Sequence, residues 1–264
     1  MTILITGGTG KTGSRVARLL TDLGHDVRVA SRSSAHRFDW NDESTWDAAV
    51  SGCSAAYLTF QPDLGLPGAD LVIGRFAARA VTLGCRRLVL LSGRGEDGAR
   101  KAERAMVASD ADWTIVRSAF FLQNFTESVF AAELAQGSLT MVEHPAAEPF
   151  IDADDIADVV VTVLLDEEYT GTVLELTGPE LLTFADVAER FGATYRSLPV
   201  DAYVGELVAA GLPAEDATGL AYLFADVLDG RNEQVTSEVP DVLGRPARTF
   251  AEFLVTTTEV SSRG

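Results

Sequence analysis

The sequence has few cysteines and no long apolar segment. Cys53 and Cys85 are the only thiols among 264 residues, which is too few for a disulfide framework or a cysteine-based metal cluster. Buried, reduced thiols in a cytoplasmic protein are therefore the expected state. No stretch approaches the roughly 18 consecutive apolar residues that a transmembrane helix requires, so no membrane span is predicted. A strand-like run begins within two residues of Met1, which leaves no room for a signal peptide.

Positive charge is scarce in the second half of the chain. The net charge is −18, and residues 118–264 contain 6 Lys and Arg against 26 Asp and Glu. Such a surface, without a basic stripe, repels nucleic acid, so no nucleic-acid partner is expected. We interpret the acidity as a contribution to solubility or to salt tolerance. The three histidines are scattered without metal-ligand spacing, and no metal site is expected.

Glycine, in contrast, is concentrated in the opening segment. Residues 3–5 form a strand-like run, residues 7–13 read GGTGKTG, and apolar residues from Val16 onward recur at helical spacing. A strand, a tight glycine turn and a helix bind phosphate, because bare backbone lets the anion approach the amides of the helix N-terminus. A Walker A loop would need glycine where Ile5 stands, which excludes an ATPase or GTPase. The spacing Gly7-x-x-Gly10-x-x-Gly13 instead indicates a dinucleotide.

The end of the next strand-like segment indicates which dinucleotide. An NAD site usually has an acidic residue about 20 residues past the loop. Here Arg32 lies 22 residues beyond Gly10, and residues 31–37 contain no acid. A guanidinium with neighbouring serine hydroxyls suits a 2′-phosphate, so we predict NADP(H) as the cofactor rather than NAD(H). The alternative is that Arg32 is only a solvated residue at a strand end.

Strand and helix patterns alternate through the first 120 residues. The predicted strands are 2–6, 26–31, 55–60, 87–92 and 113–117, and the predicted helices are 11–23, 43–50, 68–83 and 98–109. This alternation predicts an α/β fold with a doubly wound parallel sheet, the Rossmann architecture, and a small C-terminal substrate lobe. We assign residues 1–150 to the cofactor-binding core, with a further strand at 172–176. Residues 151–264 are assigned to a mostly helical lobe that does not fold independently.

Several later segments carry short helical patterns. Helices are predicted at 122–136, 153–165, 183–190, 200–210 and 214–229. Asp154 and Asp155 begin the helix at 153–165, where negative charge meets the positive end of the helix dipole, so a capping role is favoured over a catalytic one.

Taken together, these segments resemble a known family. The resemblance rests on ITGGTGKTG, VRVASRS, RFDWNDESTW (37–46), WTIVRSAFFLQNF (113–125), PFIDADDIA (149–157) and LTGPELLTFADVAERFG (176–192). They are similar to the NmrA-like atypical short-chain dehydrogenases/reductases, and within these to the ergot-alkaloid reductase and festuclavine dehydrogenase-like branch. The resemblance covers residues 2–192.

The resemblance implies a set of cofactor-binding residues in this sequence. They are Gly7, Thr9, Gly10, Lys11, Thr12 and Gly13 at the pyrophosphate, Ser31, Arg32 and Ser33 at the adenosine phosphate, Asp39 near the adenine, Phe60 along the ribose, and Ser92. It also implies that the segment from Arg117 to Asn124 borders the nicotinamide and the substrate. One departure is Ser118, because relatives usually have proline there.

The proton donor of typical short-chain dehydrogenases is absent. Their base is Tyr-x-x-x-Lys, but this chain has only two lysines, Lys11 and Lys101, preceded four positions earlier by Gly7 and Asp97. Either Lys101 donates a proton if it is desolvated, or it is a solvated helix residue. Alternatively, the acceptor is already activated, as an iminium, enone or quinone, and the protein mainly positions the reactants.

Lys101, Asn124 and Ser92 are therefore the candidate catalytic residues. Ser92 has two open interpretations, a hydrogen bond to the substrate or a strand cap. The predicted substrate pocket contains Tyr57, Ser118, Phe120, Phe121 and Asn124, although aromatic residues at these spacings also suit a core.

Two functions remain from the sequence. One is an NADPH-dependent reductase of a small activated metabolite. The other is an NADP(H)-sensing regulatory protein without turnover. A small-molecule substrate is the expected partner, and a homodimer is left open.

Overall fold

The chain forms two compact units. The computed structural model describes residues 2–144 and 146–261. Unit 1 comprises residues 1–118, 153–176 and 237–246, and unit 2 comprises the remaining residues. The division differs from a single boundary near residue 150, because the segment 153–176 completes unit 1 while residues 119–152 belong to unit 2.

Unit 1 is built on a seven-stranded parallel sheet with the order β3-β2-β1-β4-β5-β6-β8. The strands are β1 (Thr2–Thr6), β2 (Asp26–Ser31), β3 (His36–Arg37), β4 (Cys53–Leu58), β5 (Arg87–Gly93), β6 (Asp112–Ser118) and β8 (Thr172–Leu176). The central strands are continuous apolar runs buried on both faces, as a parallel sheet covered by helices requires. The predicted doubly wound parallel sheet is confirmed.

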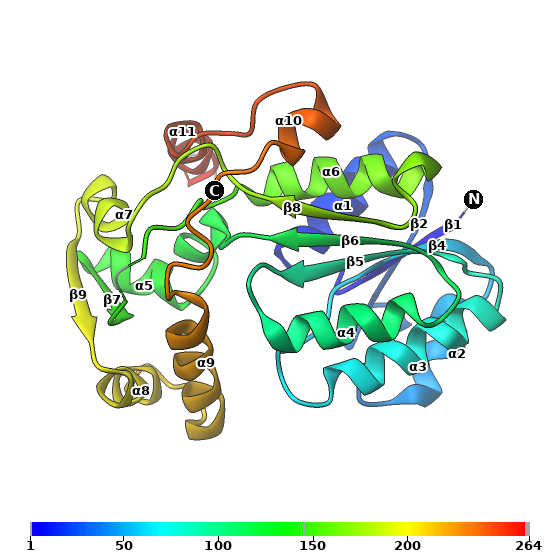
Figure 1. The fold of residues 1–264 in the computed structure, drawn as a ribbon, viewed down its shortest axis with the longest axis horizontal. Coiled ribbons are helices and arrows are strands. Elements are labelled where there is room, and N and C mark those ends of the chain that lie inside the picture. Colours follow the sequence, from blue (N-terminus) through cyan, green and yellow to red (C-terminus); the bar gives the residue numbers. More distant parts are fainter. Residues whose placement is uncertain (1, 145, 262–264) are drawn as a thin grey trace. The chain divides into compact units, whose positions relative to one another are not determined.

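Helices cover both faces of this sheet (Figure 1). Helices α1 (Lys11–Asp22) and α6 (Ala153–Leu165) pack together on one face, and α3 (Ala69–Thr82) and α4 (Asp97–Val107) pack together on the other. Two shorter helices, α2 (Trp46–Val50) and α10 (Glu238–Leu243), complete the unit. The strand order reverses between β1 and β4, and ligands of open α/β sheets bind at the carboxyl ends of the strands around such a switch point.

Unit 2 holds an apolar core of its own, rich in phenylalanine. Its strands β7 (Ser138–Val142) and β9 (Thr194–Leu198) form a parallel pair. Its helices are α5 (Val129–Ala135), α7 (Phe184–Arg190), α8 (Val200–Ala209), α9 (Ala214–Val227) and α11 (Phe250–Ser261). Single 3-10 turns lie at η1 (Glu43–Thr45) and η3 (Glu167–Tyr169) in unit 1 and at η2 (Leu122–Phe125) in unit 2.

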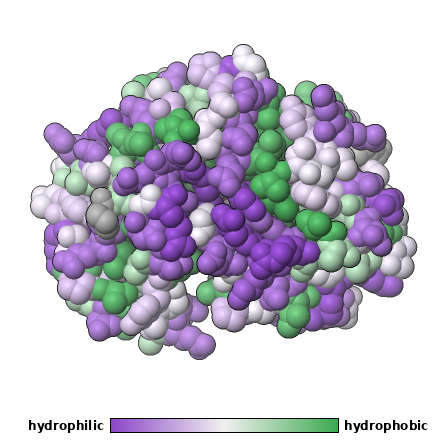
Figure 2. All heavy atoms as spheres, viewed as in Figure 1, coloured by the Kyte–Doolittle hydropathy of each residue, from purple (hydrophilic) through white to green (hydrophobic). Residues whose placement is uncertain are grey.

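Most of the molecular face drawn in Figure 2 is hydrophilic, with hydrophobic residues gathered in smaller patches. None of the helices in the described residues is long and apolar enough to cross a membrane.

Candidate cofactor site and its surroundings

The glycine loop lies between β1 and α1 and has no room for side chains at its key positions. Gly7 has a φ of +58°, and a Cβ there would lie 2.1 Å from Oγ1 of Thr59. A Cβ on Gly13 would lie 2.4 Å from the carbonyl oxygen of Gly7. Gly10 is the N-cap residue of α1 and donates its N–H to the Gly7 carbonyl at 2.8 Å. The loop is thus a tight cradle of bare backbone at a helix N-terminus, which fits a pyrophosphate.

A buried tyrosine supports this loop from within the core. The Tyr57 hydroxyl donates to Oγ1 of Thr12 at 3.0 Å, and both side chains are buried. Burial raises the pKa of Tyr57 well above its ordinary value. This placement differs from the substrate-facing position predicted for Tyr57. The reason is that β4 is a central strand with helices over both faces, so its side chains lie in the core of unit 1.

The turn after β2 leaves one cation available. Oγ of Ser31 accepts the N–H groups of Ser33 and Ser34 at 3.3 and 3.0 Å, which fixes the turn. Arg32 is exposed, and none of the described residues makes a hydrogen bond or an ion pair with its guanidinium. Ser33 is exposed beside it. The turn therefore offers a free positive charge and a hydroxyl to an anion.

An aromatic shelf lies beyond this turn. Phe60, which is half-buried, packs against Trp40 with ring centroids 5.3 Å apart. The Trp40 indole donates to the Thr59 carbonyl at 2.9 Å, which ties the segment after β3 to the end of β4. The Asp39 carboxylate is half-exposed and accepts the N–H of Asn41 at 3.0 Å. Asp39 follows β3 and Phe60 follows β4, so both residues lie after the carboxyl ends of strands of the same parallel sheet in unit 1.

Ser92 belongs to a largely buried charged network at the ends of β5, β6 and β8, in which Arg117 and Glu175 are partly exposed. Its hydroxyl donates to Glu103 at 2.7 Å, and Glu103 also accepts two hydrogen bonds from Arg117 at 2.9 and 2.6 Å. Arg117 donates to Glu175 at 3.0 Å, and Arg94 donates to the other oxygen of Glu175 at 3.1 Å. The hydrogen bond to Glu103 raises the pKa of Arg117. Burial opposes ionisation of Glu175, but hydrogen bonds from Arg94 and Arg117 hold its pKa below the ordinary value.

Of the other predicted residues of unit 1, Ser118 contacts this network through its backbone. Lys101 is exposed on α4, and its ammonium group makes no hydrogen bond or ion pair with the described residues. Lys11, in the first turn of α1, is half-buried. Ser118 ends β6, is buried, and its carbonyl accepts the N–H of Arg94 at 3.1 Å. Thr9 is exposed at the tip of the glycine loop.

Phe120, Phe121 and Asn124 belong to unit 2. Phe120 packs in a phenylalanine cluster, with ring centroids 5.3 Å from Phe184 and 5.7 Å from Phe150. Phe121 precedes η2, and its backbone pairs with Ile151. Asn124 is half-buried, and its side-chain amide makes no hydrogen bond with the described residues. Asn124 is therefore the one of the three with an available polar group.

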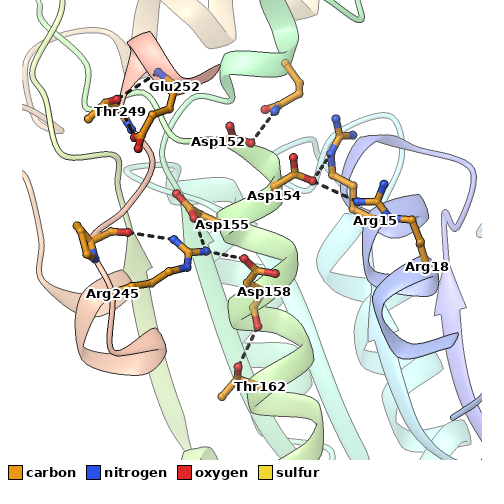
Figure 3. Close-up of polar contacts among 12 residues, drawn as sticks. Arg15, Arg18, Asp152, Asp154, Asp155, Asp158, Thr162, Arg245, Thr249 and Glu252 are labelled. Carbon is orange, nitrogen blue, oxygen red and sulfur yellow. Dashed lines mark hydrogen bonds and ion pairs between the residues drawn. The ribbon is translucent and has the colours of Figure 1, made fainter. Parts of the chain in front are cut away.

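Acidic residues at the start of α6 are engaged by arginines (Figure 3). Asp154 pairs with Arg15 at 3.0 Å and with Arg18 at 3.7 Å, both from α1. Asp155 is fully buried and pairs with Arg245 at 2.8 Å. These contacts tie α1 and the segment after α10 to α6. They support a structural role for the two acids.

The fold and the glycine cradle define a Rossmann-type dinucleotide-binding protein, and comparisons with known proteins agree. Residues 3–60 match the NAD dependent epimerase/dehydratase family. The chain is 33% identical to the uncharacterized oxidoreductase YesF of Bacillus subtilis (strain 168), over 95% of this chain and 93% of that protein. It is also 33% identical to an agroclavine dehydrogenase of Claviceps fusiformis, over 96% of each chain. A solved NADPH-dependent quinone oxidoreductase from Escherichia coli, complexed with NADPH, shares the fold with a TM-score of 0.81 at 20% identity, over 96% of this chain and 99% of that one.

The chain belongs to the atypical short-chain dehydrogenase/reductase family, in the branch of the clavine dehydrogenases. It is an NAD(P)H-dependent oxidoreductase of that family. The family resemblance and the enzyme class predicted from the sequence are confirmed.

The sequence patterns missed Glu103. It stands in the middle of an amphipathic helix, where a glutamate is usually solvated, and only the folded structure brings it to Ser92 and Arg117. Its one sequence signal is its position on α4, between Ala102 and Met106 on the buried face of that helix.

Proposed function

We propose that this protein is an NADPH-dependent reductase that transfers hydride to a small activated acceptor, such as an iminium, an enone or a quinone-like metabolite. The observation that carries the cofactor choice is the free guanidinium of Arg32 at the end of β2, beside the exposed Ser33. The glycine cradle of Gly7 and Gly13, which excludes side chains, supports binding of a dinucleotide pyrophosphate, whichever nicotinamide cofactor carries it. The bound dinucleotide supplies the hydride, and the chain supplies binding and orientation.

The side chains of unit 1 support this proposed class of acceptor. A Tyr-x-x-x-Lys pair is missing from the sequence. Lys101 is exposed, and the Ser92 proton is donated to Glu103. An iminium needs only hydride, while an enone or quinone needs hydride and a proton that water can supply, and both match the available groups. The agroclavine dehydrogenase and quinone oxidoreductase relatives support an acceptor of this kind. A cytoplasmic enzyme of small-molecule metabolism is the setting that we propose.

The cofactor part is tested by Arg32→Ala. Loss of a charge-assisted contact with the 2′-phosphate is expected to weaken NADPH binding by roughly 10- to 100-fold, with NADH binding unchanged. Arg86→Ala is the matched control. Arg86 is also exposed, but it directly precedes β5 and so lies at the amino ends of the strands, away from the turn that carries Arg32. Calorimetric titration with both dinucleotides gives the result. An undiminished preference for NADPH in Arg32→Ala would refute the assignment.

The acceptor part is tested with a panel of quinones, enones and cyclic iminium salts, by following the absorbance of NADPH. Turnover of at least one class is expected. Lys101→Met separates the proton sources, because a solvated lysine is dispensable whereas a proton-donating lysine is not. Tight binding of NADPH without turnover across the panel would favour the regulatory, cofactor-sensing alternative instead.

A further inference from the structure

Glu103 holds two strand ends at once. It lies on α4, is 4% exposed, and uses both carboxylate oxygens. Oε1 accepts from the Ser92 hydroxyl at 2.7 Å and from Nε of Arg117 at 2.9 Å, while Oε2 accepts from Nη2 of Arg117 at 2.6 Å. The two bonds from Arg117 form the paired arrangement that is geometrically the most specific contact between a guanidinium and a carboxylate.

The register of the sheet extends this contact across three strands. Ser92 on β5 is the register partner of Arg117 on β6, and Arg117 is the register partner of Glu175 on β8. Arg117 donates Nη1 to Glu175 at 3.0 Å, and Arg94 donates Nε to the same carboxylate at 3.1 Å. Five side chains thus connect the carboxyl ends of β5, β6 and β8. The ligand crevice of a parallel α/β sheet lies at this edge.

A network of this kind is a weak means of stabilising a fold. Glu103 and Arg94 are buried while Arg117 and Glu175 are partly buried, and taking these charges out of water has a desolvation penalty that apolar side chains of the same size would avoid. When every member is satisfied, however, a buried polar network selects a single arrangement of the groups that it connects. We therefore expect the network to fix the positions of Ser92 and of the turn from Gly93 to Arg94 more than to stabilise the fold.

The network also fixes the hydrogen-bonding direction of Ser92. A hydroxyl has one proton, and Ser92 gives it to Glu103, so its oxygen is left only as an acceptor. The donors Nε, Nη1 and Nη2 of Arg117 are engaged by Glu103 and Glu175. Ser92 in this arrangement therefore has no proton left to donate to the oxygen of an acceptor molecule.

We propose that Glu103 is a positioning residue for hydride transfer, which acts by holding Ser92 and Arg117 in one arrangement at the carboxyl edge of the sheet. The proposal rests on the reductase function proposed above. Glu103 touches neither cofactor nor substrate in this account. It keeps the ends of β5 and β6 at a fixed distance and orientation, on which the rate of hydride transfer depends.

The test is Glu103→Gln, which preserves volume but places an amide N–H₂ group against donors of Arg117 or Ser92. We expect kcat to fall by about 100-fold, the effect of a small misplacement of reacting groups, while KM for NADPH changes by less than about 3-fold. Hydrogen exchange of the backbone amides of residues 92–95 and 117–118 should become faster. Glu43→Gln is the control, because Glu43 is an exposed partner of Arg75 at 2.7 Å and lies outside the network.

A second variant guards against misfolding. Arg117→Lys keeps the positive charge but cannot form the paired contact, so the same fall in kcat is expected from it. If either variant folds, shows faster exchange at residues 92–95 and keeps the wild-type kcat, Glu103 has only a structural role and the proposal is overturned.

Failure of the reductase function has a different signature. In that case the wild-type protein binds NADPH but reduces no acceptor. The positioning role of Glu103 is then tested by measuring the fluorescence of bound NADPH at saturation in the wild type and in Glu103→Gln. A changed emission or anisotropy in Glu103→Gln would show that Glu103 still orders the bound cofactor although no hydride is transferred, and an unchanged one would overturn the positioning role as well.

Discussion

The Tyr57 hydroxyl donates a hydrogen bond to the Thr12 hydroxyl at 3.0 Å, and this contact joins the middle of β4 to the first turn of α1. Both side chains are buried. Thr12 therefore helps to hold the glycine loop in place, in addition to its predicted contact with the pyrophosphate. The contact links a fully buried side chain near the carboxyl end of β4 to the part of the chain that would hold a pyrophosphate.

Tyr57→Phe tests this link. The substitution removes one hydroxyl without opening a large cavity, and it leaves the buried Thr12 hydroxyl without its donor. We expect the free energy of unfolding to fall by about 1–2 kcal/mol, as measured by urea denaturation. Tyr222→Phe is the matched control, because Tyr222 is exposed and its hydroxyl makes only a long hydrogen bond, of 3.4 Å, to Asp201. An equal loss in both variants would show that the buried contact contributes nothing of its own.

Gly7→Ala and Gly24→Ala separate backbone strain from steric clash. Both positions have positive φ, +58° and +84°, so alanine is strained at each by about 1–2 kcal/mol. Only at Gly7 does the new Cβ meet another atom, Oγ1 of Thr59 at 2.1 Å, whereas the space around Gly24 is open. We expect both variants to lose stability, but only Gly7→Ala to lose NADPH binding, as measured by calorimetry. Retained binding in Gly7→Ala would show that the loop adapts.

The tight glycine turn between β1 and α1 was predictable because its signal is local. The glycines at 7, 10 and 13 act within one turn, and the apolar strands of the sheet are buried on both faces, so each strand shows in its own sequence. Strands β7 (SLTMV) and β9 (TYRSL) were missed because their polar residues interrupt any continuous apolar run, and most of β9 is exposed or half-buried.

Positions set by distant contacts were the hardest to predict. Tyr57 was expected to face a substrate, but its neighbours in the sheet and α1 enclose it. The pairing of Glu103 with Arg117, and that of Asp155 with Arg245, depends on residues far away along the chain. A single sequence contains no periodicity from which such pairs can be derived.

The carboxyl group of Asp63 predicts a pH dependence of stability. It is hydrogen-bonded to Glu96 and accepts the N–H of Gly65 at 2.7 Å, and burial, the largest influence, raises its pKa above the model-compound value of 3.8. A raised pKa in the folded state means that the protonated form is stabilised by folding. That contribution is complete below the unfolded-state pKa and is lost as the pH rises through the folded-state pKa.

Asp63→Asn is therefore expected to stabilise the protein at neutral pH. The amide donates to Glu96 at every pH and keeps an oxygen for Gly65, so a gain on the order of one buried hydrogen bond, about 1 kcal/mol, is expected near pH 7. At a pH below 3.8 the gain should shrink, because the raised pKa of Asp63 means that the wild-type carboxyl also carries its proton there. Urea denaturation at both pH values measures the difference, with Glu189→Gln as an exposed control. A gain that is the same at both pH values would exclude titration of Asp63 as its cause.

His144 predicts the opposite pH dependence, in unit 2. Its ring packs edge-on against Phe184 with centroids 5.0 Å apart, and burial lowers its pKa below 6.5 despite a weaker opposing effect of the Ala146 backbone. The folded state therefore prefers the neutral ring, while the unfolded chain takes up a proton below about pH 6.5. Stability should fall as the pH drops through this range towards the folded-state pKa.

His144→Gln removes the titrating group, so the variant should lose less stability than the wild type between about pH 8 and pH 5. His25→Gln serves as the control, because His25 lies in the turn between α1 and β2, far along the chain from the phenylalanine cluster. Parallel stability curves for His144→Gln and the wild type would mean that His144 does not titrate in this range.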